Sequence, residues 1–325
     1  MASPISHQRK LPHSIILNLD DYWSGIDGFC QHSNRDEVIS KWIEDNFESY
    51  VVSTLSERLG EQPLRVLGVG TGEGYFEVLQ MKKLKSNFSE ISATVNEPST
   101  KHIIQYQDAV DVEKQKGDLG EVHYEWHNQS FQDYMKSTGA KQKYHFISIL
   151  HAIYYVGEVE KAVTNLYELL EPSGMIFIMI ITEHTGVGKL LKTFPQVALD
   201  ETTRTSASTS RTSKSSVAST PTYVHAFNSS DIKAALSKNR IAYTQPTGYA
   251  AFCDVTPCFT QKDSLVAKEI LDTITFTVNF KESVPDEVFS QVMGFLQNNT
   301  RVVKSDQGGD KFYFDSEVDV ILISK

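Results

Sequence analysis

Between residues 64 and 181, five short apolar segments alternate with stretches of helical periodicity, and this alternation restricts the fold more than any other feature. The apolar segments read LRVLGVG, ISATVNE, VHYEWH, YHFISIL and MIFIMII. The stretches between them read YFEVLQMKKLK, TKHIIQYQDAV, FQDYMK and EVEKAVTNLYELL, and the last repeats apolar residues along one helix face. Strands that alternate with helices form a parallel sheet. The sequence therefore predicts an α/β core over residues 61–199.

The segments on either side of this core are expected to cover it or to interrupt it. Apolar residues recur at helical spacing from residue 36 to residue 60, which predicts a helix that packs on the sheet and closes one side of a pocket. Residues 1–60 are therefore expected to form a covering segment. Residues 200–222, ETTRTSASTSRTSKSSVASTPT, offer almost nothing to bury, and they predict a flexible Ser/Thr-rich insertion.

After the insertion, residues 223–325 are expected to complete the sheet and to add a smaller subdomain. A capped helix is predicted over residues 229–238, a strand over residues 274–280, a helix over residues 285–296 and a final apolar strand over residues 318–324. Because the final strand follows these late elements, the end of the sheet is predicted to be antiparallel.

The composition is that of a globular protein and excludes several classes of partner. The formal net charge is −10, from 31 basic and 41 acidic residues without a basic tract, which argues against nucleic-acid binding. The three cysteines match neither a disulfide framework nor a zinc site, so no metal is expected. The sequence has no apolar stretch of membrane-spanning length and no signal-peptide core at its start. We expect a monomeric cytoplasmic protein with a small-molecule partner and no membrane partner.

A glycine-rich turn follows the first predicted strand. Residues 70–74 read GTGEG, and a helix is predicted directly after them. Glycines let the backbone approach a ligand and adopt positive φ, and a helix start presents unpaired N–H groups to a carboxylate or a phosphate. A dinucleotide-binding fold requires G-x-G-x-x-G, but the registers that begin at Gly68, Gly70 and Gly72 all lack the last glycine. The pattern therefore disfavours a nicotinamide-dependent dehydrogenase.

Polar residues follow the second and third predicted strands. Glu97 ends the second strand, where a carboxylate can accept both hydroxyls of a ribose. After the third strand, Gln129 or Ser130 can hydrogen-bond an adenine ring, and Phe131 can stack on it. Ligands of open α/β sheets bind at the carboxyl ends of the strands, where these residues are expected. Together with the glycine loop, they predict a ligand that contains a nucleoside.

Several motifs together give the sequence a family resemblance. The segments GVGTGEG, NEPS, EWHNQSFQDY, HFISILHAIYYV and KLLKTFPQ resemble the histamine N-methyltransferase family, and the G-x-G-x-G pattern resembles the first motif of class I methyltransferases. The resemblance extends from about residue 22 to the C-terminus. It implies a Rossmann-like, seven-stranded, mostly parallel sheet with helices on both faces and a smaller substrate-covering subdomain. It also implies methyl transfer from S-adenosyl-L-methionine to a nitrogen of a small amine or imidazole compound.

The resemblance also assigns a cofactor site to particular residues. The family's cofactor contacts correspond to Gly70, Gly72, Glu97, His102 and Leu150, with Ser130 or Phe131 on the adenine side. His102 stands where the family usually has an amide side chain, and it can still donate a hydrogen bond. The cofactor half of the family pattern is therefore retained.

The substrate half departs from the family pattern. The family's substrate contacts correspond to Tyr22, Phe29, Arg35, Tyr155 and Ser316. In the ungapped register, Arg35 replaces a glutamate that would pair with an amine or imidazole, and Ser316 replaces an asparagine. Arginine favours carboxylate, sulfonate or phosphate groups, so we hypothesise a substrate that carries an acidic group. Two alternatives stay open: Asp36 and Glu37 follow directly, so one inserted residue would restore an acid to the site, or Arg35 is a solvent-facing residue at a helix start.

Methyl transfer from a sulfonium requires alignment rather than a metal, and the acceptor nitrogen must present a free lone pair. The catalytic candidates are Tyr155 and the residues His151, Glu183 and His184 at the ends of the fourth and fifth predicted strands. Val187 and Leu191 replace two tryptophans of the family's aromatic pocket. Two alternatives therefore stay open: a non-catalytic relative that binds the cofactor as a sensor or scaffold, and a methyltransferase with a different acceptor.

Overall fold

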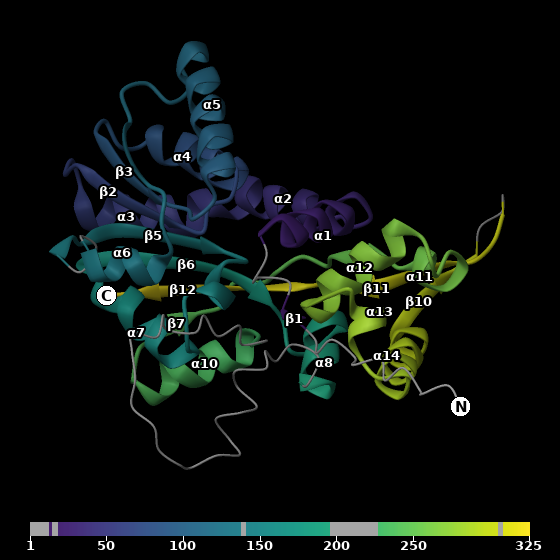
Figure 1. Cartoon of the computed structure of the whole chain (residues 1–325). Coiled ribbons are helices and arrows are strands. Elements are labelled where there is room, and N and C mark those ends of the chain that lie inside the picture. Colours follow the sequence, from purple (N-terminus) through teal and green to yellow (C-terminus); the bar gives the residue numbers. More distant parts are fainter. Residues whose placement is uncertain (1–12, 15–18, 138–140, 196–226, 305–307) are drawn as a thin grey trace, which may run out of the picture. The chain divides into compact units, whose positions relative to one another are not determined.

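The chain folds into two compact units. Figure 1 shows the chain coloured from its N-terminus to its C-terminus. The computed structural model describes residues 13–14, 19–137, 141–195, 227–304 and 308–325. The larger unit comprises the described residues within 34–185, 227–251 and 316–325, and the smaller unit comprises those within 1–33, 186–226 and 252–315. The Ser/Thr-rich insertion expected at residues 200–222 lies outside the described residues.

A seven-stranded sheet forms the centre of the larger unit, with the strand order β4-β3-β2-β5-β6-β12-β7 (Figure 1). The strands from β2 to β6 pair in parallel, whereas β12 pairs antiparallel with both β6 and β7. The strands are β2 (Leu64–Val69), β3 (Ile91–Asn96), β4 (His123–His127), β5 (Tyr144–Leu150), β6 (Leu170–Ile181), β7 (Tyr243–Thr244) and β12 (Val318–Ser324). The predicted seven-stranded, mostly parallel sheet with an antiparallel end is confirmed.

Helices cover both faces of this sheet, as predicted. Figure 1 shows α4 and α5 on one side of it and α7 and α10 on the other. The long helix predicted over residues 36–60 is present as α2, a π-helical turn and α3 in direct succession. The helices are α2 (Arg35–Phe47), the π turn (Glu48–Val52), α3 (Ser53–Leu59), α4 (Tyr75–Lys85), α5 (Thr100–Lys116), α6 (Phe131–Ser137), the short 3₁₀ helix η4 (Ile153–Tyr155), α7 (Val159–Glu168) and α10 (Ser229–Lys238).

The core of the larger unit lies between α2 and the central strands. Trp42 stacks on Phe177 with 5.3 Å between ring centroids, and Phe47 meets Phe146 edge-on at 5.6 Å. Every residue of β5 is buried, because a parallel strand covered on both faces has no solvent side. This continuous packing fixes the positions of the strand ends, where the candidate site residues lie.

The smaller unit consists of helices and two small sheets. One sheet has the order β10-β11-β8, and β1 pairs with β9 in the other. The sequence patterns did not predict the three-stranded sheet. The elements are α1 (Leu19–Gln31), α8 (Gly186–Thr193), α11 (Thr256–Thr260), α12 (Leu265–Thr275), α13 (Phe280–Ser283), α14 (Asp286–Asn299), β1 (His13–Ser14), β8 (Phe252–Asp254), β9 (Thr277–Val278), β10 (Thr300–Val303) and β11 (Lys311–Asp315).

The strand predicted over residues 274–280 is wrong, because only the two residues of β9 are extended. Phe276 and Asn279 have φ of 53° and 50°, which interrupts an extended chain on both sides of β9. The Asp272 carboxylate accepts the backbone N–H groups of Asn279 and Phe280, each at 2.8 Å, and this contact turns the chain into α13. A tertiary hydrogen-bond contact therefore overrides the alternating apolar pattern.

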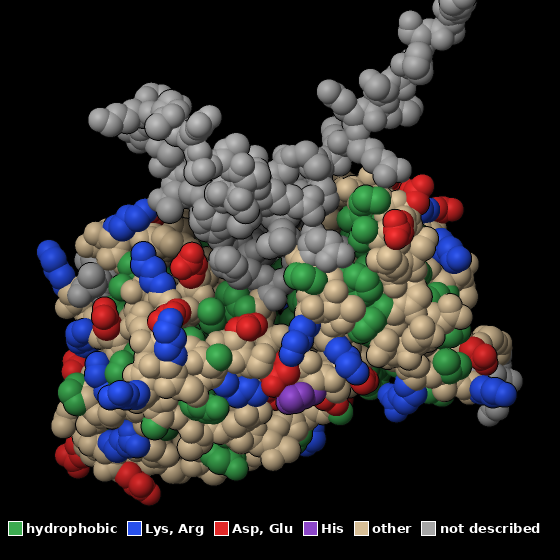
Figure 2. All heavy atoms as spheres, turned by 90° about the horizontal axis from the view of Figure 1, so that it is seen from below, with side chains coloured by type: hydrophobic (Ala, Val, Ile, Leu, Met, Phe, Trp, Pro, Cys, Tyr) green, Lys and Arg blue, Asp and Glu red, His purple; other side chains and the backbone are tan. Residues whose placement is uncertain are grey.

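Charged side chains of both signs are interspersed on the face of the described chain that Figure 2 shows. Within the described ranges, no helix combines the length and the apolar character needed to cross a membrane. The same ranges contain no group of three or more histidine, cysteine, aspartate or glutamate side chains that could hold a metal ion.

Candidate cofactor and active site

The glycine loop connects β2 to α4, and its backbone has conformations that other residues rarely adopt. Gly70, Gly72 and Gly74 have φ of 61°, 56° and 76°. A Cβ atom at Gly70 would lie 2.5 Å from the Cβ of Ala152, and one at Gly74 would lie 2.1 Å from the Tyr106 ring. At these two positions, both the backbone conformation and the lack of space therefore require glycine.

Glu97 directly follows β3 and contacts the glycine loop. Its Oε2 accepts the Gly72 N–H at 2.9 Å, and its Oε1 accepts the Ser99 N–H at 2.8 Å. Burial raises the pKa of this carboxyl group, and the two N–H donors oppose that shift. A carboxylate offers about four acceptor positions, so about two of them remain for further donors. Glu97 therefore has the chemistry that a ribose with two neighbouring hydroxyls requires.

Two asparagines, which sequence analysis missed, join the neighbouring strand ends. The Asn96 side-chain amide donates to the Gln129 carbonyl at 2.8 Å. The Asn128 amide donates to the carbonyl oxygens of Glu97 and Pro98 at 3.1 and 2.8 Å. These bonds fix the loop after β3 against the loop after β4, and they hold Glu97 in place. In the sequence, the only sign of these bonds is that an asparagine stands at the end of each strand. The hydrogen-bond partners of the two asparagines are set by the tertiary structure.

His102 and Leu150 flank this region from α5 and β5. His102 is buried in the first turn of α5, and its backbone N–H donates at 3.3 Å to the hydroxyl of Ser99, the N-cap residue. Leu150 is buried at the last position of β5, at the carboxyl end of the sheet. Their predicted contacts with the cofactor stay predictions.

The residues predicted on the adenine side lie at the start of α6. The Ser130 hydroxyl donates to Asp133 at 2.8 Å and accepts its N–H at 3.1 Å, which is the pattern of a helix cap. Phe131 is buried and stacks on Tyr134 with 6.3 Å between ring centroids. Gln129 donates from its side chain to the Ser137 hydroxyl at 3.3 Å. All three side chains thus have protein contacts, and which of them meets adenine stays a prediction.

His151 follows β5 with φ of 49°, which is unusual for a residue other than glycine. Its Nε2 is buried and has no hydrogen-bond partner among the described residues. Burial, and then the positive charge of Arg35, lowers the pKa of the imidazole to about 3. Arg35 begins α2, and its guanidinium pairs with Asp36 at 2.7 Å. The structure therefore brings two predicted site residues, far apart in the sequence, within electrostatic reach of each other.

Glu183 and His184, the other candidate bases, follow β6. Glu183 accepts a hydrogen bond from the Ser229 hydroxyl at 2.8 Å, and it pairs with Lys233 at 3.5 Å. Burial raises the pKa of Glu183, but these two partners and His184 outweigh burial, so the pKa lies below its usual value. The His184 side chain is 72% exposed. These contacts favour a structural role for Glu183, because a stabilised carboxylate is a weak base.

Tyr155 and Ser316 are the remaining substrate candidates in the larger unit. Tyr155 ends η4, and its carbonyl accepts the Gln132 side-chain amide at 2.8 Å. Ser316 lies before β12, and its N–H donates to the Ala251 carbonyl at 2.9 Å. Its hydroxyl is buried and has no partner in the described part of the chain. A buried hydroxyl of this kind is a candidate ligand contact.

The other predicted substrate residues lie in the smaller unit. Tyr22 is part of α1, but its side chain is outside what the structure describes. Phe29 is buried on the same helix. A role for Tyr22 and Phe29 in a substrate site stays a prediction. Val187 and Leu191, the positions that correspond to two tryptophans of the family's aromatic pocket, are buried in α8.

The chain matches known methyltransferases over most of its length. Residues 34–239 match a family model described as a methyltransferase domain. Histamine N-methyltransferase of Xenopus tropicalis is 23% identical over 318 residues, which cover 96% of this chain and 98% of that protein. Carnosine N-methyltransferase 2 of Gallus gallus is 23% identical over 296 residues, covering 88% and 82%. The crystal structure of the plantazolicin methyltransferase BamL superposes with a TM-score of 0.45 and 13% identity, covering 94% and 91%.

Proposed function

The chain belongs to the methyltransferase domain family and is an S-adenosylmethionine-dependent methyltransferase, and we propose that it methylates a nitrogen of a small amine or imidazole compound. The relatives named for histamine and carnosine support a small nitrogen acceptor. The observation that carries the proposal is the buried Nε2 of His151 at the carboxyl end of β5, which has no hydrogen-bond partner in the described part of the chain. This end of the sheet is where open α/β folds bind their ligands.

The cofactor would be held by the glycine loop and the residues after β3. When bound, S-adenosylmethionine supplies an electrophilic methyl group on a sulfonium. In this proposal, Glu97 accepts the ribose hydroxyls with the acceptor positions that Gly72 and Ser99 leave open. His102, Leu150 and either Ser130 or Phe131 complete the contacts.

His151 is suited to orient an acceptor nitrogen rather than to remove its proton. With a pKa of about 3, the imidazole is neutral at every pH near 7, and a base this weak takes up a proton poorly. A neutral imidazole has one donor and one acceptor nitrogen. Nε2 can therefore form a hydrogen bond with the substrate that aligns the nitrogen lone pair with the methyl group, and alignment is the main requirement of an in-line transfer.

Arg35 determines which acceptors suit the site. Its positive charge already disfavours a cation near His151, because it lowers the pKa of the imidazole. The same charge would repel a protonated amine and would attract a carboxylate. The proposed substrate is therefore a small nitrogen compound that carries an acidic group. Carnosine, for which one relative is named, combines an imidazole with a carboxylate.

The proposed function is tested with a panel of amines, imidazoles and amino acids and with S-adenosylmethionine that carries a deuterated methyl group. Mass spectrometry of the products should find label on the nitrogen of a small acceptor, with the highest turnover for imidazoles that carry a carboxylate. Label only on oxygen, carbon or a macromolecule would show a different acceptor. Cofactor binding without any product would identify a sensor or scaffold.

Replacing His151 with asparagine should lower kcat/KM for the acceptor by about 10- to 100-fold, because a hydrogen bond to the substrate is lost. Asparagine tolerates the positive φ of this position better than other residues do, so the backbone is retained. Calorimetry should show that S-adenosylhomocysteine binds within about twofold of the original affinity.

The matched control for this variant is His145→Asn in β5. The Nδ1 of His145 accepts the Arg65 N–H at 3.1 Å, a contact within the sheet. This control should alter the melting temperature and leave kcat/KM unchanged. Equal losses of kcat/KM in both variants would count against an orienting role for His151.

Replacing Arg35 with glutamate should reverse the charge preference of the acceptor site. We expect kcat/KM for acidic imidazoles to fall by about tenfold or more and kcat/KM for histamine to rise, because the site then attracts a cation. Arg65→Glu is the control, since Arg65 pairs with Glu171 at 2.6 Å near the starts of β2 and β6, at the opposite end of the strands from the site. An unchanged ratio of the two substrates in Arg35→Glu would show that Arg35 does not contact the acceptor.

A further inference from the structure

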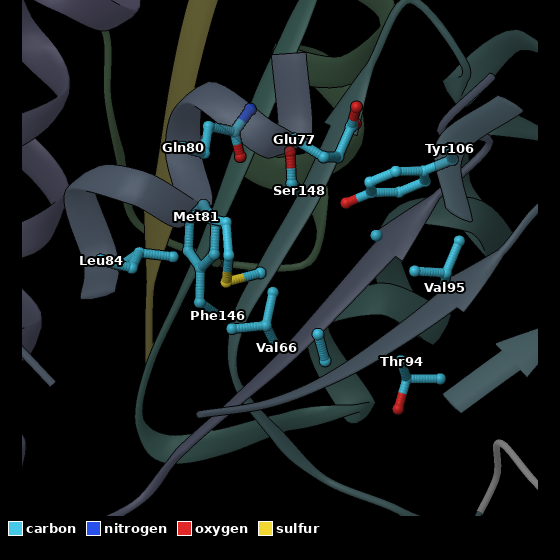
Figure 3. A pocket seen from close by; sticks show the side chains of 12 residues that line it. Val66, Glu77, Gln80, Met81, Leu84, Thr94, Val95, Tyr106, Phe146 and Ser148 are labelled. Atoms are coloured by element: carbon cyan, nitrogen blue, oxygen red, sulfur yellow. The ribbon is translucent and has the colours of Figure 1, made fainter. Parts of the chain in front are cut away.

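A small cavity lies inside the larger unit, between the sheet and the helices α4 and α5 (Figure 3). Its space is sufficient for about one water molecule. Most of its lining is apolar, from residues such as Val66, Met81 and Phe146. The polar exceptions are Glu77, Gln80, Thr94, Tyr106 and Ser148, together with the backbone of Gly68.

Two polar atoms at this cavity have no protein partner among the described residues. They are the Nε2 of Gln80 and the hydroxyl of Ser148, and both are fully buried. Buried polar groups in native proteins are almost always hydrogen-bonded, to protein or to ordered water. A cavity water is stable when it has two to four polar partners, and this lining offers an amide donor, a hydroxyl and a carboxyl group.

Glu77, the third of these groups, is in the first turn of α4 and is only 6% exposed. Its Cγ is 3.7 Å from the place where a Cβ at Gly68 would lie, so the side chain lies against the strand that leads into the glycine loop. Figure 3 shows the Glu77 side chain beside Ser148 and the Tyr106 ring.

Opposing effects decide the charge of Glu77. Burial raises the pKa of the carboxyl group, its own backbone N–H lowers it, and the negative charge of Glu97 raises it, with a result of about 8. The ionisable groups around it are Glu97 after β3 and Tyr106 of α5, and Tyr106 also contacts Tyr124 of β4. Burial raises the pKa of both tyrosines, so they stay neutral. Glu77 is therefore a neutral acid at pH 7.

We propose that Glu77 is a positioning residue for the cofactor loop: its carboxyl group shares one buried water with Gln80 and Ser148 in this cavity, and so fixes the start of α4. The inference rests on the assignment of the glycine loop and Glu97 to the cofactor. It is independent of the identity of the methyl acceptor.

Ionisation of Glu77 should therefore weaken cofactor binding. Glu97 is 3% exposed without ligand, and a bound nucleoside would exclude the remaining solvent at its carboxyl group. The screening between the two carboxylates is then weaker, so a charge on Glu77 costs more in the complex than in the free protein. The complex consequently holds the Glu77 proton more tightly. In the free protein the pKa of Glu77 is about 8, so affinity for the cofactor should begin to fall as the pH rises through this value. The total loss is about tenfold for each unit by which the pKa of Glu77 in the complex exceeds its pKa in the free protein.

The test is calorimetric titration of the full chain with S-adenosylhomocysteine between pH 6.5 and about pH 9.5. Between these two pH values, the affinity of the unsubstituted protein should fall about five- to tenfold further than the affinity of Glu77→Gln, because glutamine is neutral at every pH. Ionisation of the ligand's own amino group affects both proteins alike and cancels in the comparison. A parallel decline in the two proteins would overturn the proposal.

Two further variants separate positioning from other effects. Glu113→Gln makes the same exchange on the surface of α5, where lysines lower the pKa of Glu113 to about 2, and it should retain the full alkaline decline. Glu77→Met removes both the ionisable group and its hydrogen bonds at similar size. It should bind S-adenosylhomocysteine about threefold or more weakly than Glu77→Gln at pH 7, because the water loses a partner. Equal affinity of these two Glu77 variants would overturn the positioning role.

A second readout is the stability of the protein without ligand. The pKa of Glu77 is raised in the folded state, so its contribution to stability is complete below pH 4.5 and is lost as the pH rises to 8. Melting temperatures of Glu77→Gln should therefore fall less than those of the original protein over this range. The same pH dependence in both proteins would contradict a protonated Glu77.

Discussion

Glutamine in place of Glu97 is expected to weaken binding of S-adenosylhomocysteine by about 100-fold or more. The carboxylate accepts N–H groups from Gly72 and Ser99 and, in the proposed complex, two ribose hydroxyls. Glutamine keeps only one acceptor oxygen, and its NH₂ group would face a backbone donor. At least one ribose contact and one loop contact are lost, each to a charged acceptor and each worth about 1.5–3 kcal/mol. Isothermal titration calorimetry measures the effect directly.

The control for this variant is Glu90→Gln, the same exchange at an exposed position before β3. It should bind S-adenosylhomocysteine with unchanged affinity. Circular dichroism of Glu97→Gln should match that of the original protein, because the sheet does not depend on the loop. Binding by Glu97→Gln within about threefold of the original would refute the role of Glu97 at the ribose.

Alanine in place of Gly74 should have the largest effect on folding, a loss of about 2–5 kcal/mol in the free energy of unfolding. The residue has φ of 76°, and its Cβ would lie 2.1 Å from the ring of the buried Tyr106. Tyr106 is packed edge-on against Trp126 at 5.2 Å between ring centroids, so the ring cannot move without disturbing this contact. Denaturation in urea, followed by circular dichroism, gives the stability difference.

Gly117→Ala separates the two causes of this loss. Gly117 has the same left-handed backbone, with φ of 89°, but no described residue lies within 4 Å of the place where its Cβ would be. Its substitution should cost only the backbone strain, about 1–2 kcal/mol. Equal losses at both positions would show that the Tyr106 ring adapts without cost.

The parts of the fold that sequence analysis predicted correctly depend on local properties. Apolar runs such as YHFISIL become strands buried on both faces, and the amphipathic segment after them becomes α7. The glycine loop was recognisable because positive φ is a property of the residue itself. The position of Glu97 was recognisable because it directly follows a predicted strand, at the carboxyl end of the parallel strands.

The parts that could not be predicted depend on particular side-chain contacts, near or far in the sequence, which a hydrophobic pattern does not encode. The extended pattern over residues 274–280 gave no sign that the Asp272 carboxylate would bind two N–H groups and begin a helix there. The influence of Arg35 on the pKa of His151 likewise appears only when α2 and β5 are placed together. Glu77 reads in the sequence as an ordinary helix residue, and only its burial beside an internal cavity makes it unusual.

The strand order β6-β12-β7 governs how the larger unit can form during synthesis. β5 pairs with one edge of β6, which ends at Ile181, but β12, which pairs with the other edge, begins only at Val318. A growing chain therefore carries β6 with an open, apolar edge while more than a third of the sequence is still being added. Open edges of this kind are templates for pairing between chains, and pairings between distant segments form slowly. The sheet becomes complete only when residues 318–324 have left the ribosome, and until then the second edge of β6 is open to pairing with other chains.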